Sequence, residues 1–372
     1  MSGRVAHRDR RALHPLLEAH PSRGDHQGPR RRGRLPGRQR RGVPAGSRRR
    51  GPGRRGAEGP PVGAGHVKRS TEHERIESLL RRLRPSDALL VPNGDDAAVL
   101  RGDPRPLSIS VDAAVEGVHF RRAFAPLDVL GRRAAVAALS DLAAMGAEPT
   151  ALFAALVLPR DFADEELELL MGGVANAARE VGAVVAGGNL SRGGNLAMTF
   201  TVVGHHDGAP LTRAGAQAGD GLFVTAPPGH AALGLEYLLR GGGPVDAEPY
   251  LDAWLRPRAH VAEGLRLVGR AHACIDVSDG LAQDLGHLCR ASGVGATLEL
   301  PADPELERQA ARIGQDPRSL RLRGGEAYGL LYAAPDACGV EDAIRVGTVE
   351  AEPGIRGAGD APGFDHFAEP ER

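Results

Sequence analysis

Lysine is nearly missing from this sequence: among 372 residues, Lys68 is the only one. A Walker A loop, a protein-kinase core, a pyridoxal-dependent enzyme and a Schiff-base aldolase each require a well-placed lysine. Lys68 stands at the edge of an arginine-rich leader, away from every motif described below. The sequence therefore excludes these four classes of site.

Cysteine is scarce, and long apolar runs are absent. Cys274, Cys289 and Cys338 are odd in number and lack C-x-x-C spacing, which argues against a zinc site or a disulfide framework and for a reducing compartment. The longest clean apolar run, A-L-F-A-A-L-V-L at residues 151–158, is far shorter than the roughly 18 residues of a membrane span. We therefore expect a soluble, cytoplasmic protein with no membrane partner.

Aromatic residues are missing from residues 1–66, which are rich in Gly and Pro and hold 17 Arg but only 4 acidic residues. Such a segment cannot bury enough apolar surface to offset chain entropy, so we expect a disordered extension. Three interpretations remain: an arm that binds nucleic acid, a transit peptide, or upstream codons misread as protein. We favour the last, and nucleic acid is not an expected partner.

The pattern changes at residue 67, where V-K-R-S-T-E-H-E-R-I-E-S-L-L-R-R-L has apolar residues at helical spacing. Strand-like and helix-like segments then alternate, which predicts a mixed α/β (α+β) fold with domains at 67–210 and 211–372. Strands are expected at 107–111, 151–158, 197–203, 222–226 and within 325–332, and helices at 126–146, 162–182, 230–240 and 257–270. The segment V-V-A-G-G-N at 184–189 predicts a strand that runs into a glycine loop.

Aspartates recur at the ends of apolar segments. They are Asp95 and Asp96 in the turn N-G-D-D, Asp112 after S-I-S-V, Asp141 inside A-L-S-D-L-A-A-M-G, and Asp276 and Asp279 in C-I-D-V-S-D-G-L. Some have ordinary structural explanations: a surface turn for the first pair, a cap for Asp112, and an N-cap by Ser278 and Asp279 for a helix that begins at Gly280. Asp141 is harder to explain, because an acid among Leu and Ala residues is partly desolvated and needs a partner.

Converging carboxylates cannot all remain ionised without cations. Two unit charges about 4 Å apart interact by about 4 kcal/mol at an effective dielectric near 20, so several pairs would approach the whole stability of a domain. Oxygen ligands without a His/Cys cluster suit Mg²⁺, which binds a few carboxylates together with substrate phosphates. The residues thus indicate a Mg²⁺-dependent nucleotide site in which arginines and glycine amides help to hold phosphate.

Seven motifs in order resemble those of the thiamine-monophosphate kinase family, from about residue 72 to the terminal G-F-D-H-F. They are G-D-D-A-A-V-L, S-V-D-A-A-V-E-G-V-H-F, L-S-D-L-A-A-M-G-A-E-P, A-G-G-N-L-S-R, L-T-R-A-G-A, I-D-V-S-D-G-L-A-Q-D-L and G-G-E-A-Y. The resemblance implies the two-domain aminoimidazole-ribonucleotide-synthetase-like fold, as a homodimer whose N-terminal halves form a barrel-like sheet across the dimer. It also implies direct in-line transfer of phosphate from ATP to thiamine monophosphate with several Mg²⁺ ions, giving thiamine diphosphate without a covalent intermediate.

The resemblance also assigns site residues. Metal ligands would be Asp96, Ser110, Val111 through its carbonyl, Asp112, Asp141, Asn189, Asp276 and Asp279. ATP would be held by the Gly187–Gly188 loop with Asn189, Arg213 and Ser278, and thiamine by His119, Glu326 and Phe364. Asp95 would only shape the turn.

The chain departs from the family pattern at three positions. Asn189 replaces an Asp after the glycine pair, and Ala327 and Gly329 replace the second and third acidic residues of a G-E-D-Y-E-L motif. We expect an active enzyme that needs more Mg²⁺. The alternatives are a degenerate, non-catalytic binder of nucleotide or thiamine phosphate, and another synthetase of the same superfamily.

Overall fold

The computed structural model describes residues 70–91 and 93–358, and the predicted extension of residues 1–66 and Phe364 lie outside these ranges. Within them, the helices are α1 (Glu72–Arg82), α2 (Leu127–Ala144), α3 (Asp164–Glu180), α4 (His230–Leu239), α5 (Glu248–Leu255), α6 (Val261–Leu267), α7 (Leu281–Ser292), α8 (Pro304–Arg312) and α9 (Pro317–Arg323), with 3₁₀ turns at Arg122–Phe124 and Val245–Ala247. The strands are β1 (Leu89–Val91), β2 (Val99–Leu100), β3 (Leu107–Val115), β4 (Glu148–Leu158), β5 (Val184–Arg192), β6 (Ala197–His205), β7 (Gly221–Val224), β8 (Ala273–Asp276), β9 (Gly295–Leu298), β10 (Leu330–Ala334), β11 (Ile344–Glu350) and β12 (Gly354–Arg356). The mixed α/β prediction is confirmed.

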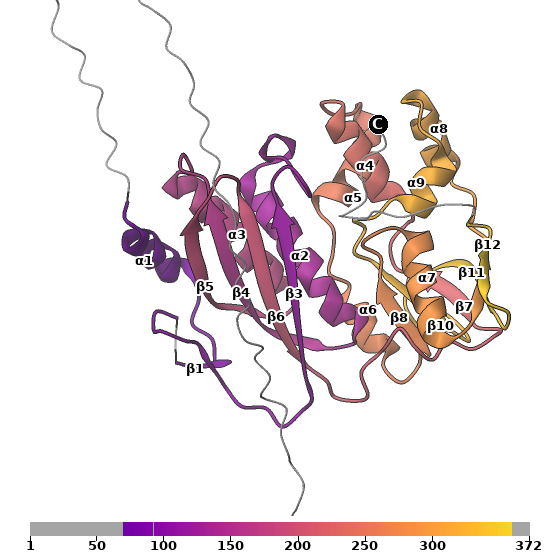
Figure 1. The fold of residues 1–372 in the computed structure, drawn as a ribbon, viewed down its shortest axis with the longest axis horizontal. Coiled ribbons are helices and arrows are strands. Elements are labelled where there is room, and N and C mark those ends of the chain that lie inside the picture. Colours follow the sequence, from indigo (N-terminus) through magenta and orange to yellow (C-terminus); the bar gives the residue numbers. More distant parts are fainter. Residues whose placement is uncertain (1–69, 92, 359–372) are drawn as a thin grey trace, which may run out of the picture. The chain divides into compact units, whose positions relative to one another are not determined.

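The first large sheet has the strand order β3-β6-β4-β5, with β4 and β5 parallel and the other pairs antiparallel (Figure 1). Helices α2 and α3 pack against it and against each other. Their close approach depends on Gly173, where a Cβ would lie only 1.8 Å from the Asp128 carbonyl oxygen. The small hairpin β1–β2 contributes Leu89 and Leu100 to a separate cluster on this sheet.

The second sheet has the order β12-β9-β11-β7-β10-β8 and is antiparallel except for the β12–β9 pair. Side chains alternate between its faces, as in any strand. Leu222 and Val224 of β7 pack in the cluster that includes α7, whereas Phe223 belongs to the cluster that includes α2. The two hydrophobic clusters therefore cover opposite faces of the sheet.

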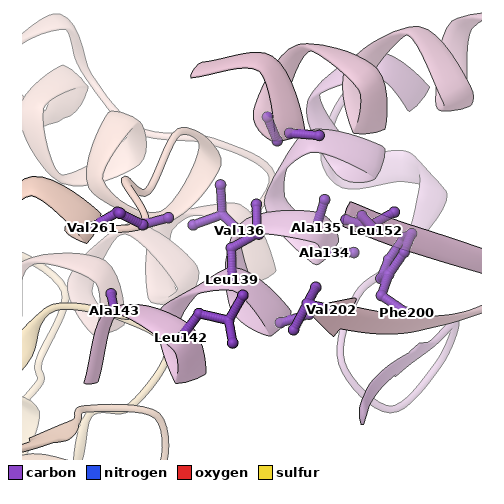
Figure 2. Close-up of a cluster of buried hydrophobic side chains, with 14 of the residues drawn as sticks. Ala134, Ala135, Val136, Leu139, Leu142, Ala143, Leu152, Phe200, Val202 and Val261 are labelled. Carbon is purple, nitrogen blue, oxygen red and sulfur yellow. The ribbon is translucent and has the colours of Figure 1, made fainter. Parts of the chain in front are cut away.

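Helix α2 joins the two sheets. Its Ala- and Leu-rich surface is buried almost throughout, as expected for a helix enclosed on several sides. Figure 2 shows its side chains beside Leu152, Phe200 and Val202 of the first sheet and Val261 of α6. The predicted domain boundary near residue 210 falls between β6 and β7, where the chain passes from one sheet to the other.

The predicted glycine loop at residues 187–189 is wrong. Strand β5 continues through Gly187 and Gly188 to Arg192, and its pairing with β4 shifts by one residue between Val185 and Gly187. Gly188 is required by this pairing, because a Cβ there would lie 1.9 Å from the Ala154 carbonyl oxygen. A β-bulge therefore replaces the expected loop, since an extra residue is taken up inside the strand.

Candidate active site

Two of the predicted carboxylates lie together where α2 crosses the two sheets. Asp141 of α2 accepts a hydrogen bond from the Ser110 hydroxyl of β3, on the side of the strand that faces the helix. Asp276, the last residue of β8, accepts a 2.9 Å hydrogen bond from the hydroxyl of Ser140, the residue before Asp141. Ser140 was not identified from the sequence. Consecutive residues of α2 thus place the two acids together: Asp141 is one of them, and Ser140 binds the other.

Burial and mutual repulsion act on this pair. Burial raises the pKa of Asp141, while the Ser110 hydrogen bond and the charge of Arg213 oppose that shift. Burial, followed by repulsion from Asp141, raises the pKa of Asp276 to about 6, against the opposing effects of Ser140 and Arg213. Arg213 therefore lies near enough to act electrostatically on both carboxylates. Its role in binding phosphate stays a prediction.

The donor set at this point suits magnesium. Within the described ranges, no three His, Cys, Asp or Glu side chains are grouped as a ready-made metal site. Magnesium does not need such a group, because it keeps several waters and is usually bound through one or two carboxylates plus substrate phosphates. Asp141 and Asp276 are desolvated, repel each other and have hydroxyl groups as their hydrogen-bond partners. A divalent cation would neutralise their charge, so the two residues are suitable magnesium ligands.

The turn between β8 and α7 is held by a residue that sequence reasoning missed. The Asp284 carboxylate accepts hydrogen bonds from the main-chain N–H groups of Ser278 and Asp279, at 3.1 and 3.2 Å. The predicted N-cap by Ser278 and Asp279 is wrong: the N-cap is Gly280, and no side chain caps the helix there. Burial, then repulsion from Asp276, raises the pKa of Asp284 to about 7. The sequence offered one indication of this role, because Asp284 is an acidic residue in the first turn of a helix.

A cavity of about 600 Å³, which we call the acceptor cavity, brings together five predicted site residues. They are Asp112, His119, Ser278, Asp279 and Glu326. The His119 ring is oriented by the Val115 main-chain N–H, which donates 3.0 Å to Nδ1. In a neutral ring the proton is therefore on Nε2.

Glu326 is held in this cavity by two residues that the sequence did not assign to the site. The Trp254 indole Nε1–H of α5 donates to Glu326 Oε2 at 2.6 Å, and the Arg133 guanidinium of α2 lies 3.2 Å from Oε1. Arg133 has the signal that marked Asp141, a charged residue inside an Ala-rich helix. Trp254 has no such signal.

Three further predicted ligands line a different cavity of about 970 Å³. Asp96, Gly188 and Asn189 face it, along with the apolar side of α1 and part of α3. The Asp95 carboxylate accepts a 2.8 Å hydrogen bond from the Asp96 N–H, as expected of a residue that shapes the turn. Asp96 and Asn189 are exposed, and the structure does not bring them to the Asp141–Asp276 pair. The Val111 side chain is exposed and has no ligand atom, so only its main-chain carbonyl could bind a metal.

Two of the three departures from the family pattern lie away from both large cavities. Ala327 and Gly329 line a third cavity of only about 10 Å³, together with Ala226 and Gly229. A Cβ at Gly329 would lie 2.6 Å from the Ala226 Cβ, so Ala226 occupies the space that a side chain at 329 would need. Glu326 and Tyr328, in contrast, line the acceptor cavity. Of the three departures, Asn189 alone lines one of the large cavities.

Comparison with known proteins identifies relatives of this chain. Residues 94–206 match the family described as AIR synthase related protein, N-terminal domain. The thiamine-monophosphate kinase of Salmonella typhimurium is 38% identical over 251 residues, which cover 65% of this chain and 76% of that protein. The corresponding kinase of Mycobacterium tuberculosis is 35% identical over 263 residues, covering 69% and 78%.

Solved structures agree with the sequence matches. The crystal structure of thiamine-monophosphate kinase from Stenotrophomonas maltophilia K279a superimposes with a TM-score of 0.68 at 31% identity, covering 76% of this chain and 94% of that one. A structure described as AaThiL complexed with AMPPCP and TMP has a TM-score of 0.67 at 29% identity, covering 79% and 96%. Fold and sequence therefore point to the same relatives.

Proposed function

Because the chain belongs to the thiamine-monophosphate kinase family, we propose that it transfers the terminal phosphoryl group of ATP to thiamine monophosphate, giving thiamine diphosphate and ADP. The observation that carries this proposal is the convergence of β3, α2 and β8. These elements bring Ser110, Asp141 and Asp276 together, and the acceptor cavity contains Asp112 and Asp279. Carboxylates arranged in this way would bind polyanionic substrates through magnesium ions.

The predicted ligands then have distinct roles. Asp112, Asp141, Asp276 and Asp279 would hold magnesium together with Ser110 and the Val111 carbonyl. Asp96 and Asn189, which line the second cavity, would hold a separate magnesium ion there. When bound, magnesium neutralises charge on the transferring phosphoryl group and the leaving group. Gly188, Asn189, Arg213 and Ser278 would hold ATP. His119 and Glu326 would hold the acceptor, with Phe364 as a further candidate outside the described residues.

No residue of the chain is assigned a covalent role. Phosphoryl transfer needs mainly alignment of the donor and acceptor phosphates and neutralisation of charge. Arg213 acts electrostatically on Asp141 and Asp276, and His119 lines the acceptor cavity with its ring fixed by the Val115 N–H. The acceptor phosphate would therefore attack ATP directly.

The positions of Ala327 and Gly329 weaken the argument for a degenerate binder. Both residues line the small third cavity and not the acceptor cavity. Replacing the family's acidic residues at these two positions therefore removes no carboxylate from the acceptor cavity. Asn189 retains one carbonyl oxygen that can serve as a ligand. Loss of catalysis is thus not favoured by these substitutions.

We further propose a homodimer formed through the open face of β3. In the described part of the chain, β3 is an edge strand, and Leu107, Ile109 and Val111 are 53%, 61% and 62% exposed on one side of it. A row of exposed apolar residues on an edge strand favours association. A second copy would extend this sheet across the dimer, as the family resemblance implies.

A cytoplasmic location is part of the same proposal. Cys274, Cys289 and Cys338 are all buried and unpaired, which fits a reducing compartment. In the described residues, the helices are too short or too polar to cross a lipid bilayer.

Formation of thiamine diphosphate tests the function directly. Full-length protein is incubated with thiamine monophosphate, ATP and a magnesium series, and thiamine diphosphate and ADP are quantified by chromatography. Equal amounts of both products, dependent on magnesium, are expected. Binding of ATP and thiamine monophosphate without product would instead identify a non-catalytic binder.

A further inference from the structure

The Glu326 carboxylate is held in the acceptor cavity by two residues that are distant from it in the sequence, Trp254 and Arg133. Trp254 donates to Oε2 at 2.6 Å. Arg133 Nη2 lies 3.2 Å from Oε1, but this buried nitrogen makes no aligned hydrogen bond to it. Oε1 is therefore stabilised by charge while keeping its capacity to accept a hydrogen bond from a ligand.

Arg133 is itself immobilised. Its residue exposure is 5%, its Nη1 donates to the Trp254 carbonyl, and its guanidinium lies 3.9 Å from the centroid of the Trp254 ring. The Tyr328 ring is 5.3 Å away. A guanidinium that is packed between aromatic rings and hydrogen-bonded to main chain loses little freedom when it orients a carboxylate.

The backbone that carries Glu326 is strained. Glu326 and Tyr328 have φ values of 63° and 52°, a region that residues other than glycine rarely adopt. Their N–H groups donate 2.8 and 2.9 Å to the carbonyls of Ser278 and Val277, in the turn that carries Asp279. Strain that is maintained by surrounding contacts is characteristic of functional sites.

Resting on the function proposed above, we propose that Arg133 is a positioning residue that sets acceptor specificity. It holds Glu326, through direct charge and through Trp254, so that the carboxylate receives the heterocyclic end of thiamine monophosphate. That end carries both N–H donors and a positive charge, which are the partners a fixed carboxylate selects. Arg133 itself need not touch the acceptor.

The position of Arg133 on α2 gives this role a geometric consequence. Asp141 follows it by eight residues on the same continuous helix, so the two lie about 12 Å apart along the axis at 1.5 Å per residue. One rigid helix thus sets the separation between the end that holds the heterocycle and the end that holds metal and phosphate. An acceptor of the wrong length could not satisfy both.

The test compares Arg133→Met, Arg133→Lys and Trp254→Phe with wild type and with Arg132→Met. Arg132 is a matched control, because it precedes Arg133 on α2 but pairs with Glu180 at 2.6 Å and does not line the acceptor cavity. For each variant, KM is measured for thiamine monophosphate and for ATP, together with kcat and the thermal midpoint. The inhibition constant of thiamine, which has the heterocycles but no phosphate, is measured as well.

We expect Arg133→Met to raise KM for thiamine monophosphate about tenfold or more, because it leaves Glu326 without its charged partner. The thiamine inhibition constant should rise by a similar factor, and KM for ATP should change little. Trp254→Phe should act in the same direction, Arg133→Lys should restore part of the loss, and Arg132→Met should behave as wild type.

Several results would overturn the inference while leaving the proposed function intact. One is an active Arg133→Met enzyme whose KM for thiamine monophosphate is unchanged. Another is an equal rise in KM for ATP and for the acceptor. A rise for thiamine monophosphate without a rise in the thiamine constant would place the effect at the phosphate end instead. A wild-type protein that makes no thiamine diphosphate would contradict the proposed function itself.

Discussion

The Ser140 hydroxyl of α2 donates a 2.9 Å hydrogen bond to Oδ2 of Asp276 at the end of β8. The same hydroxyl oxygen lies 2.7 Å from the Ala137 carbonyl, so its single proton can serve only one acceptor fully. Ionised Asp276 is the stronger acceptor, because charge-assisted hydrogen bonds exceed neutral ones. Ser140 therefore favours the charged form of Asp276 that a magnesium ligand requires.

Replacing Ser140 with alanine should weaken magnesium binding. Loss of a hydrogen bond to a buried charge typically costs about 1.5–3 kcal/mol, so the half-saturating Mg²⁺ concentration should rise roughly tenfold. The measurement is product formation against Mg²⁺ at saturating ATP. Thr150→Val is a suitable control, because it removes a hydroxyl near the start of β4 whose hydrogen bond to His205 involves neither Asp141 nor Asp276. An unchanged magnesium curve for Ser140→Ala would show that Asp276 does not bind the ion.

Stability of the metal-free protein should fall as pH rises. Burial raises the pKa of Asp276 to about 6 and that of Asp284 to about 7, above an ordinary value of 3.8. The native protein therefore holds protons that the unfolded chain releases, and the free energy of unfolding decreases between about pH 4 and pH 7. Because a tenfold difference in proton affinity between the folded and unfolded states corresponds to about 1.4 kcal/mol, the loss is on the order of a few kcal/mol.

Urea unfolding in EDTA at several pH values checks this expectation. Magnesium competes with protons for Asp276, so added Mg²⁺ should stabilise the protein more at neutral pH than at pH 5. Asp284→Asn removes one of the two groups and should flatten the pH dependence in EDTA. A free energy of unfolding that stays constant over this range would contradict the electrostatic account.

Asn189→Asp should lower the magnesium requirement. Asn189 Nδ2 donates 2.9 Å to the Ser191 hydroxyl on the exposed side of β5, and an aspartate would exchange that donor for a negative charge. Because ligand charge tunes cation affinity, we expect the half-saturating Mg²⁺ to fall roughly threefold or more. Asn195→Asp adds the same charge beside the Glu116 carbonyl and should have no such effect. If both variants match wild type, Asn189 does not contact the ion.

The sequence indicated the local features of the site well. The helix that carries Asp141 followed from its Ala- and Leu-rich composition, and the strand that carries Ser110 followed from period-two alternation. Asp95 could be assigned to the turn because Asn-Gly precedes it. Each of these depends on neighbours within a few residues. Local spacing is sufficient information for such features.

Contacts between distant segments could not be predicted. Trp254 and Glu326 are 72 residues apart, and nothing in either segment specifies the other. The predicted strand at 184–189 was expected to end in a glycine loop, and its continuation through Gly187 and Gly188 was missed, because glycine ordinarily breaks a strand. Here the close approach of Ala154 makes glycine necessary within the strand. Such features depend on how whole elements pack against one another.

Introducing a charge at the exposed face of β3 should separate the proposed dimer. Ile109 is 61% exposed between Leu107 and Val111, so an arginine there would be tolerated by the monomer but would place two like charges in the interface. Val245→Arg is the control, since Val245 is 89% exposed in a 3₁₀ turn after α4. Sedimentation equilibrium should show a dimer for wild type and Val245→Arg and a monomer for Ile109→Arg. A dimer that survives Ile109→Arg would place the interface elsewhere, and a monomeric wild type would exclude the proposed assembly.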